Sequence, residues 1–378
     1  MVFGFLCKHQ KKMKVVYLFN SSLPSYNANS LQVANMCYNI AKYIGQITLI
    51  TPNTGLKKTI FSHYGLNKNF KILKIKYFNS FPKGLKYYLF SIISIFYSLK
   101  LKPDLFITRN YFTLFLLILL QKKVIFEVHS SLEIEGRLNN LIYNNLPIFN
   151  SKNLVNLIFI TNSVKNFFYK KYKIKDRKHC ILPSSSNIVP VIPKPQNNKK
   201  FKIGYFGLVQ KSRGFNFICN LSKIDHQNEY HVIGGTESVI NNYKKKFYKK
   251  NLILKSYIPN KAIKDYIKKM DLLILPYEKE VLSSGNVNEI SKFTSPMKLF
   301  DYLASSKPII SSSLPVLNEI LKDKKNCIFV KGLNIYKWKL EINRFLNLPN
   351  HRLIVSKNNF SLFKNYTYKT RVKKMFNF

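Results

Sequence analysis

Short apolar runs alternate with longer amphipathic stretches along the 378-residue chain. In the first half the runs are MKVVYLF from Met13, QITLIT, PDLFIT, KVIFEV and NLIFIT, with a helical pattern near residues 30–43. In the second half FKIGYFG, EYHVIGG, NLILKSYI, DLLILPY, KPIISSS and NCIFV continue the scheme. Strand-like runs alternating with helices are typical of parallel sheets covered by helices. The pattern predicts an α/β protein with its ligands at the polar strand ends.

One stretch breaks this alternation. Residues 182–200 read LPSSSNIVPVIPKPQNNKK, with four prolines, three serines and no periodicity. Such composition is typical of a linker. We therefore expect a first doubly wound domain over residues 1–185, a linker over 186–200 and a second such domain over 201–354. A last helix, about residues 355–378, is expected to pack back on the first domain, and the two domains should face each other across a cleft.

The net charge of the chain indicates which classes of partner the protein could bind. Lysine and arginine number 62 against 17 acids, a net charge of +45, and no acid precedes Asp104. Such a potential attracts phosphates of nucleic acids, membranes or nucleotides. With only seven Arg but 41 Asn, A+T-rich coding explains part of the excess, though not the missing acids. The five cysteines are scattered without metal spacing or a disulfide pattern, which suits a reducing cytoplasm.

Apolar stretches near 111–120 and 89–99 are shorter than the roughly 18–20 residues that span a bilayer, and we expect both to be buried helices. The N-terminus does not follow a secretory signal pattern. Residues 80–102, SFPKGLKYYLFSIISIFYSLKLK, combine lysines with large apolar residues, as helices lying on membranes do. A buried helix with solvated lysine ends is the alternative.

The segment GYFGLVQKSRGF carries the first candidate site. A glycine turn that follows a strand and leads into a helix lets backbone N–H groups and the helix dipole meet phosphate. Gly204, Gly207 and Gly214 supply the glycines, and Arg213, near Lys211, can add a bidentate contact to a diphosphate. The spacing is neither the dinucleotide fingerprint nor a Walker loop, so an ordinary tight turn remains an alternative.

The segment TSPMKLFDYLASSKPII, from residue 294, carries the second candidate site. Ser295 is expected to cap a helix and Pro296 to begin it. Lys298 then lies in the first turn, where a cation opposes the helix dipole unless an anion is nearby. Asp301, three residues on, shares its face. A lysine on phosphate and an aspartate on ribose would hold a nucleotide diphosphate; a solvated Lys–Asp pair is the alternative.

Here the chain resembles glycosyltransferase family 4, retaining enzymes of the GT-B fold (glycosyl transferases group 1). YFGLVQKSRGF, HVIGGTES, YIPNKAIKDYIKKMDLLILPY and YTYKTRVKKMF resemble motifs of its donor domain in the right order. SPMKLFDYLASSKPII is similar to the subset with an "SPxK" helix. PSYNANSLQVANMCYNIAKYIGQITLIT, KPDLFITRN, VIFEVHS, FITNSVKNFFYKKY and ILPSSSNI resemble the acceptor domain more loosely.

The resemblance implies roles for particular residues. Arg213 and Lys298 match groups on the donor diphosphate, and His129 matches a histidine facing the donor sugar, although a hydrogen-bonded histidine at a strand end is the alternative. Asp301 matches the second acid of a paired motif and would bind ribose. The remaining implied contacts are Gly207, Lys211, Gly214, Gly235 and Ser295 to the donor, and Asn29 and Ser30 to the acceptor.

The chain also departs from the family pattern. The first acid of the pair falls at Phe293, and Glu289 from the preceding loop is a candidate substitute. An arginine often found after the first glycine of the loop is Leu208, and Asp301 is one methylene shorter than the usual glutamate. These departures lie in the residues that the resemblance assigns to the donor.

The sequence thus predicts a retaining hexosyltransferase-like enzyme that moves a sugar from a nucleotide diphosphate sugar to an envelope glycan or lipid-linked acceptor. With no Asp-x-Asp motif, we expect neither a metal nor another cofactor. We expect a cytoplasmic protein, peripheral on the inner face of the plasma membrane. A GT-B nucleotide-sugar epimerase is an alternative, but it needs acid–base carboxylates that the first domain scarcely offers. A nucleic-acid-binding protein is another, although no zinc module, RNP-like strand or helix-turn-helix pattern occurs.

Overall fold

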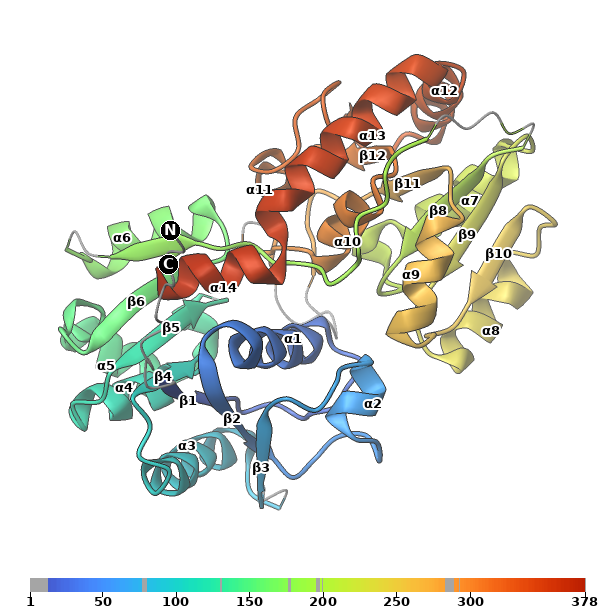
Figure 1. Cartoon of the computed structure of the whole chain (residues 1–378). Coiled ribbons are helices and arrows are strands. Elements are labelled where there is room, and N and C mark those ends of the chain that lie inside the picture. The colour runs from blue at the N-terminus through green and yellow to red at the C-terminus, as the bar shows by residue number, and fades with distance from the viewer. Residues whose placement is uncertain are drawn as a thin grey trace, which may run out of the picture.

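Two parallel sheets form the frame of the molecule (Figure 1). The structure, a computed structural model, describes residues 13–76, 80–129, 131–175, 178–194, 198, 200–282, 289–291 and 293–377. The first sheet has the order β3-β2-β1-β4-β5-β6-β7 and the second the order β10-β9-β8-β11-β12-β13. Every strand pair in both sheets is parallel. The expected fold, two doubly wound domains, is confirmed.

The strands of the first sheet are β1 Met13–Leu18, β2 Gly45–Pro52, β3 Lys71–Ile75, β4 Leu105–Thr108, β5 Val124–Val128, β6 Leu154–Phe159 and β7 His179–Ile181. Its helices are α1 Ala28–Tyr43, α2 Ile60–Tyr64, α3 Lys83–Leu99, α4 Tyr111–Leu119, α5 Arg137–Asn145 and α6 Asn162–Tyr172, with short 3-10 turns η1 Leu132–Glu135 and η2 Ile148–Asn150. Successive strand residues point to opposite faces, so Val15 packs in one core layer and Val16 in the other.

The strands of the second sheet are β8 Lys202–Phe206, β9 Glu229–Ile233, β10 Leu252–Lys255, β11 Leu272–Leu275, β12 Ile309–Ser312 and β13 Ile328–Val330. Its helices are α7 Phe215–Ile224, α8 Glu237–Lys246, α9 Asn260–Lys268, α10 Met297–Ser305, α11 Pro315–Asn318, α12 Ile335–Leu346 and α13 Pro349–Phe363, with the 3-10 turn η3 Lys211–Arg213. Two further core layers cover the faces of this sheet.

The chain passes between the domains twice. The proline-rich segment after β7 leads into the second domain, and η4, Lys364–Tyr366, leads back into α14, Tyr368–Phe376. The two passages are joined by a parallel bridge between Ser186 and Thr367. Helix α13 packs on α10, whereas α14 packs on α1 of the first domain (Figure 1).

Helix α3 differs from the expected buried helix. Its inner face carries Ser91, Ser94 and Ser98, each 0% exposed, whereas Ile92 and Phe96 are 50% and 58% exposed. The apolar stretch therefore places several of its largest side chains in solvent. Among the described helices, none combines the length and apolar character needed to cross a membrane.

Candidate functional site

A cavity of about 480 Å³ lies between the domains, at the carboxyl ends of both sheets. His129 and Ile160 follow β5 and β6 on one side, while Gly207 and Gly234 follow β8 and β9 on the other, and all four line it. In parallel α/β sheets this edge is where ligands bind. The first residues of α10 line the same cavity.

Lys298 supplies an unpaired amino group to this cavity. Its Nζ is buried and has no hydrogen-bond partner, and it lies 4.1 Å from the ring centre of Tyr205 and 4.4 Å from that of Tyr277. Burial, reinforced by the charge of Arg213, lowers the pKa of Lys298 well below its ordinary value. An anionic ligand would favour the protonated form of this buried, unpaired amine, so the arrangement indicates a site built for an anion.

Arg213 reaches the cavity from the glycine loop. Its Nε donates to Gln210 Oε1 at 3.2 Å and its Nη2 to the Leu282 carbonyl at 3.3 Å. Gly214, with φ +75°, makes the turn possible, since a Cβ there would lie 1.8 Å from the Pro276 carbonyl oxygen. The loop therefore turns tightly enough to direct Arg213 toward the N-terminus of α10, where helix amides and dipole favour an anion.

Asp301 lies one turn further along α10 and also lines the cavity. Its Oδ1 accepts a hydrogen bond of 2.5 Å from the Ser186 hydroxyl of the interdomain segment. Burial raises the pKa of Asp301 to about 6, although Ser186 and the nearby Lys264 oppose the shift. The carboxylate is therefore ionised at neutral pH and can accept hydrogen bonds from ligand hydroxyls.

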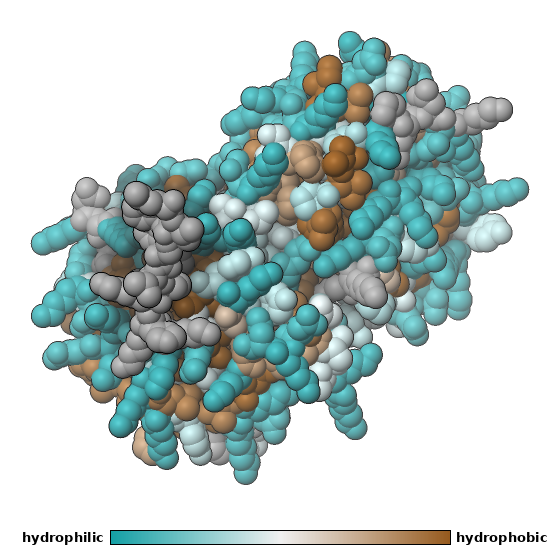
Figure 2. Space-filling view, viewed as in Figure 1, coloured by the Kyte–Doolittle hydropathy of each residue, from teal (hydrophilic) through white to brown (hydrophobic). Residues whose placement is uncertain are grey.

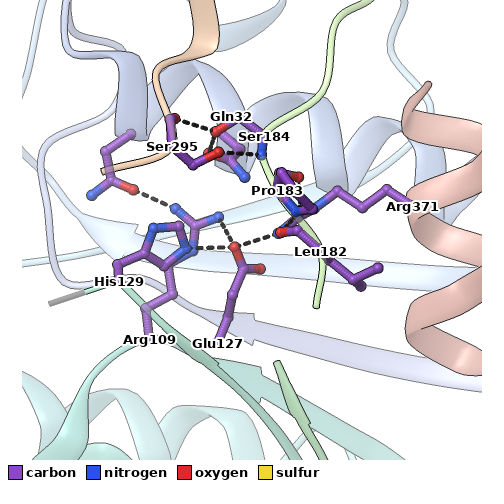
Figure 3. Close-up of polar contacts among 10 residues, drawn as sticks. Gln32, Arg109, Glu127, His129, Leu182, Pro183, Ser184, Ser295 and Arg371 are labelled. Atoms are coloured by element: carbon purple, nitrogen blue, oxygen red, sulfur yellow. Dashed lines mark hydrogen bonds and ion pairs between the residues drawn. The ribbon is translucent and has the colours of Figure 1, made fainter. Parts of the chain in front are cut away.

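The prediction that Ser295 caps α10 is wrong. The cap position is Pro296, and no side chain caps the helix. Ser295 Oγ instead accepts from the Ser184 backbone N–H at 2.8 Å, and the Ser295 carbonyl accepts from the Ser184 hydroxyl at 2.8 Å (Figure 3). Ser295 thus joins the segment after β7 to the residues before α10, and its hydroxyl is occupied by the Ser184 N–H rather than by the helix.

His129 is oriented by Glu127, two residues earlier in the chain. Its Nε2 lies 2.5 Å from Glu127 Oε1 (Figure 3). Burial and the adjacent Arg109 guanidinium lower the pKa of His129 to about 4, so the ring is neutral at neutral pH. Because an ionised carboxylate only accepts hydrogen bonds, Nε2 carries the proton and Nδ1 is left as an acceptor.

Glu127 also holds two arginines from distant segments. Its Oε1 accepts from Arg109 Nη2 at 2.9 Å and from Arg371 Nη2, on α14, at 2.6 Å (Figure 3). Burial alone would raise the pKa of Glu127, but the two guanidinium groups and His129 outweigh it and hold the pKa well below its ordinary value. Arg371 also donates to the carbonyls of Leu182 and Pro183. This cluster joins α14, the start of the linker and the histidine of the cavity.

The structure gathers seven of the twelve candidate residues in the cavity. They are Asn29, His129, Gly207, Arg213, Ser295, Lys298 and Asp301. Asn29 accepts a hydrogen bond from Arg109. Gly214 and Gly235 stand behind the lining, where Gly214 shapes the loop and the Gly235 carbonyl accepts from the Tyr257 N–H.

Three other candidates are not brought to the cavity. Lys211 is exposed on η3. Ser30 is 1% exposed and donates to the Ser22 carbonyl in the first domain. Glu289 is exposed, accepts from the Ser291 N–H at 2.7 Å and does not line the cavity. Within the described part of the chain, no cluster of three His, Cys, Asp or Glu side chains could hold a metal ion.

Sequence reasoning missed the cluster around Glu127. A glutamate between apolar residues of a strand-like run, in a half of the chain with few acids, is a buried charge that needs partners. The sequence carries that signal. It does not identify the partner Arg371, which lies 244 positions away.

Further contacts join the two domains near the cavity and beside it. Tyr26 and Tyr257 stack with ring centres 5.0 Å apart, and Phe293 packs on Phe167 of α6 at 5.4 Å. Glu319, after α11, accepts hydrogen bonds from the N–H groups of Asn162 (2.8 Å) and Ser163 (3.1 Å) at the start of α6. Tyr26, Tyr257 and Phe293 line the cavity, whereas the Glu319 contact lies outside its lining.

Two parallel-sheet domains with a cavity between them form the GT-B fold. Residues 192–361 match the family model "Glycosyl transferases group 1". The family match and the fold together show a glycosyltransferase. No curated protein matches the sequence.

Solved structures with the same fold cover almost the whole chain. A sucrose-phosphate synthase from Thermosynechococcus elongatus is 11% identical, with 96% of this chain and 97% of that one covered and a TM-score of 0.71. Anabaena HepE in complex with UDP and glucose is 10% identical, with 96% and 99% covered and a TM-score of 0.66. The lipopolysaccharide outer core galactosyltransferase WaaB is 14% identical, with 97% and 98% covered and a TM-score of 0.65. At these identities the likeness shows the fold.

Proposed function

We propose that this chain transfers a sugar, with retention and without a divalent cation, from a nucleotide diphosphate sugar to an envelope glycan or lipid-linked acceptor. The observation that carries the proposal is the buried, unpartnered Nζ of Lys298 in the interdomain cavity. Retention is implied by the resemblance to family 4. Ligands named for similar folds support the donor class, since HepE is described with UDP and glucose. WaaB, named for lipopolysaccharide, supports the acceptor class.

The diphosphate would bind to Lys298, Arg213 and the first turn of α10, which we call the cationic wall. With the diphosphate on Lys298, Arg213 and the first turn of α10, the ligand compensates charges that the protein leaves unpaired. Asp301, one helical turn away, accepts hydrogen bonds from the ribose hydroxyls. His129 faces this wall from the first domain and presents an unprotonated Nδ1 to hydroxyls of the sugar or acceptor.

The same groups act on the reaction. As the bond between the sugar C1 and the phosphate oxygen breaks, negative charge develops on the departing diphosphate. Lys298, Arg213 and the helix amides stabilise that charge, which lowers the barrier. The acceptor oxygen forms the new bond to C1, and its proton passes to an oxygen of the departing phosphate. The protein therefore needs no separate base, and the two cations replace a bridging metal.

Substitution of the cationic wall tests this proposal. Removing one charge-stabilising donor costs about 10²–10³ in turnover, so Lys298→Ala and Arg213→Ala should each lower sugar transfer by that order and weaken donor binding. Lys211→Ala is the matched control, because this lysine is exposed beside Arg213 but outside the cavity, and its activity should equal that of the wild type. Addition of a chelator should leave all rates unchanged. Wild-type turnover in Lys298→Ala would overturn the proposal.

We further infer that the first domain binds the anionic inner face of a membrane through α3. Its outward side chains include Leu85 (46% exposed), Ile92 and Phe96, while its inner face carries serines. Lys100 follows the helix, with its Nζ 4.5 Å from the Phe96 ring centre. Where α3 lies in Figure 1, the surface in Figure 2 shows brown apolar groups among teal polar ones. Apolar groups ringed by lysines fit anionic lipid.

Vesicle binding tests the membrane surface. The wild-type protein should co-sediment with vesicles of phosphatidylcholine and phosphatidylserine at low salt, and less so as salt rises. Phe96→Glu and Ile92→Glu should reduce binding at least tenfold. Leu340→Glu on α12 is the matched control, because Leu340 is 67% exposed on the second domain and should not matter. If the wild type does not bind anionic vesicles even at low salt, α3 is not a membrane surface.

A further inference from the structure

One corner of the interdomain cavity is apolar. Ile160, at the end of β6, lines it from the first domain, and Ile290 and Phe293 line it from the second. Ile160 is 3% exposed, and the other two are half-buried. Phe293 is supported from behind by Phe167, whose ring meets it edge-on at 71°. The corner is therefore built from both domains and is held in place by packing.

The order of residues along the chain separates this corner from the residue proposed to bind ribose. Phe293 precedes α10, Lys298 lies in the first turn and Asp301 lies one turn further. A donor with its diphosphate on Lys298 and its ribose at Asp301 directs its sugar toward the residues before the helix. The residues before the helix that line the cavity include Ile290 and Phe293, and Ile160 lines it from the facing domain.

The corner selects for particular sugar substituents. A buried hydroxyl without a hydrogen-bond partner costs about 1–3 kcal/mol, whereas a buried methyl group gains about 0.8 kcal/mol. We propose that the donor sugar bears a methyl group, as a 6-deoxyhexose or an N-acetylated hexosamine does, and that this methyl packs against Ile160, Ile290 and Phe293. This inference rests on the proposed function and names the substrate class of the same site.

The test compares donors that share a nucleotide. UDP-N-acetylglucosamine is set against UDP-glucose, and dTDP-6-deoxyglucose against dTDP-glucose, with affinity measured by calorimetry and donor hydrolysis measured without acceptor. A methyl-sized difference in an apolar pocket changes selectivity about 10- to 200-fold. We expect a preference of this order for the methyl-bearing member of at least one pair. The pair that shows the preference identifies whether the methyl belongs to an acetamido group or to a 6-deoxy sugar.

Substitution at Phe293 tests whether the preference for a methyl-bearing donor arises at this corner. Phe293→Glu should reduce the preference at least tenfold or reverse it, whereas Phe293→Leu, which keeps an apolar wall, should retain it. UDP and dTDP affinity in both variants shows that the cavity is intact. Equal affinity for both members of each pair, or a preference unchanged in Phe293→Glu, overturns the inference while the proposed transfer stands. Absence of binding by every nucleotide and nucleotide sugar overturns the proposed function itself.

Discussion

The Glu127 cluster gives the sharpest prediction for stability. Glu127 is 0% exposed, and its carboxylate is shared by Arg109 and Arg371, whose side chains are 6% and 2% exposed. In Glu127→Gln the shape is kept, but two buried guanidinium groups lose their countercharge. Breaking a buried pair by removing one partner costs about 3–5 kcal/mol. Against a total stability of about 5–15 kcal/mol, we expect a severe loss.

The assay is urea and thermal unfolding of the whole chain. About 1 kcal/mol shifts the melting temperature of a domain of 150–250 residues by about 2–4 °C, so Glu127→Gln should melt roughly 10 °C lower. Glu229→Gln is the matched control. Glu229 pairs with His231 at the same 2.5 Å, but its side chain is 23% exposed and it holds no arginine. We expect a loss below about 1 kcal/mol there. Equal, small losses in both variants would refute the reasoning.

The pH dependence follows from the same cluster. The pKa of Glu127 is lowered on folding, so its stabilisation is complete above the unfolded pKa of about 4.3. It is lost as pH falls from there toward the folded pKa. The wild type should therefore lose stability steeply below about pH 4, and Glu127→Gln, which has no carboxylate to protonate, should show a shallower decline. A decline of identical slope in both proteins contradicts the assignment.

Two further predictions concern the cavity. Because burial raises the pKa of Asp301 to about 6, donor affinity should fall as pH drops through 6 and the carboxylate protonates. Asp301→Asn should bind weakly at every pH without that step, as calorimetry from pH 5 to 8 can check. Glu319→Gln weakens the interdomain cap on α6, so the unliganded protein should scatter with a larger radius of gyration and bind donor more weakly. The exposed Glu237→Gln should change neither quantity.

Much of the fold could be predicted from the sequence because buried parallel strands are continuous apolar runs. All six strands of the second sheet were predicted, as were five of the first. The missed strands are β3, which reads KILKI, and β7, which reads HCI. Both lie at edges of the sheet, where one side is unpaired and apolar residues are fewer. The prediction for helix α3 was wrong because three of its buried residues are serines, whereas the apolar Ile92 and Phe96 are exposed.

The candidate site was predictable only where local motifs specify it. Lys298, Arg213 and Asp301 belong to short segments with recognisable helix or turn chemistry, and the structure brings them together. The cap at Ser295 was not predictable, because Ser184, 111 positions away, competes for its hydroxyl. Interdomain partners such as Phe167 for Phe293 depend on how two domains meet. No local pattern encodes that arrangement.

The return of α14 to the first domain has a consequence for engineering and for domain exchange. The first domain is completed by a helix from the far end of the chain, with Arg371 bound to Glu127 and α14 packed on α1. A chain cut at the linker would lack this helix and leave Glu127 without one of its arginines. Chimeras that exchange the first domain should therefore carry residues 13–185 and 367–377 as one unit. The first domain is thus encoded by two separated pieces of the sequence.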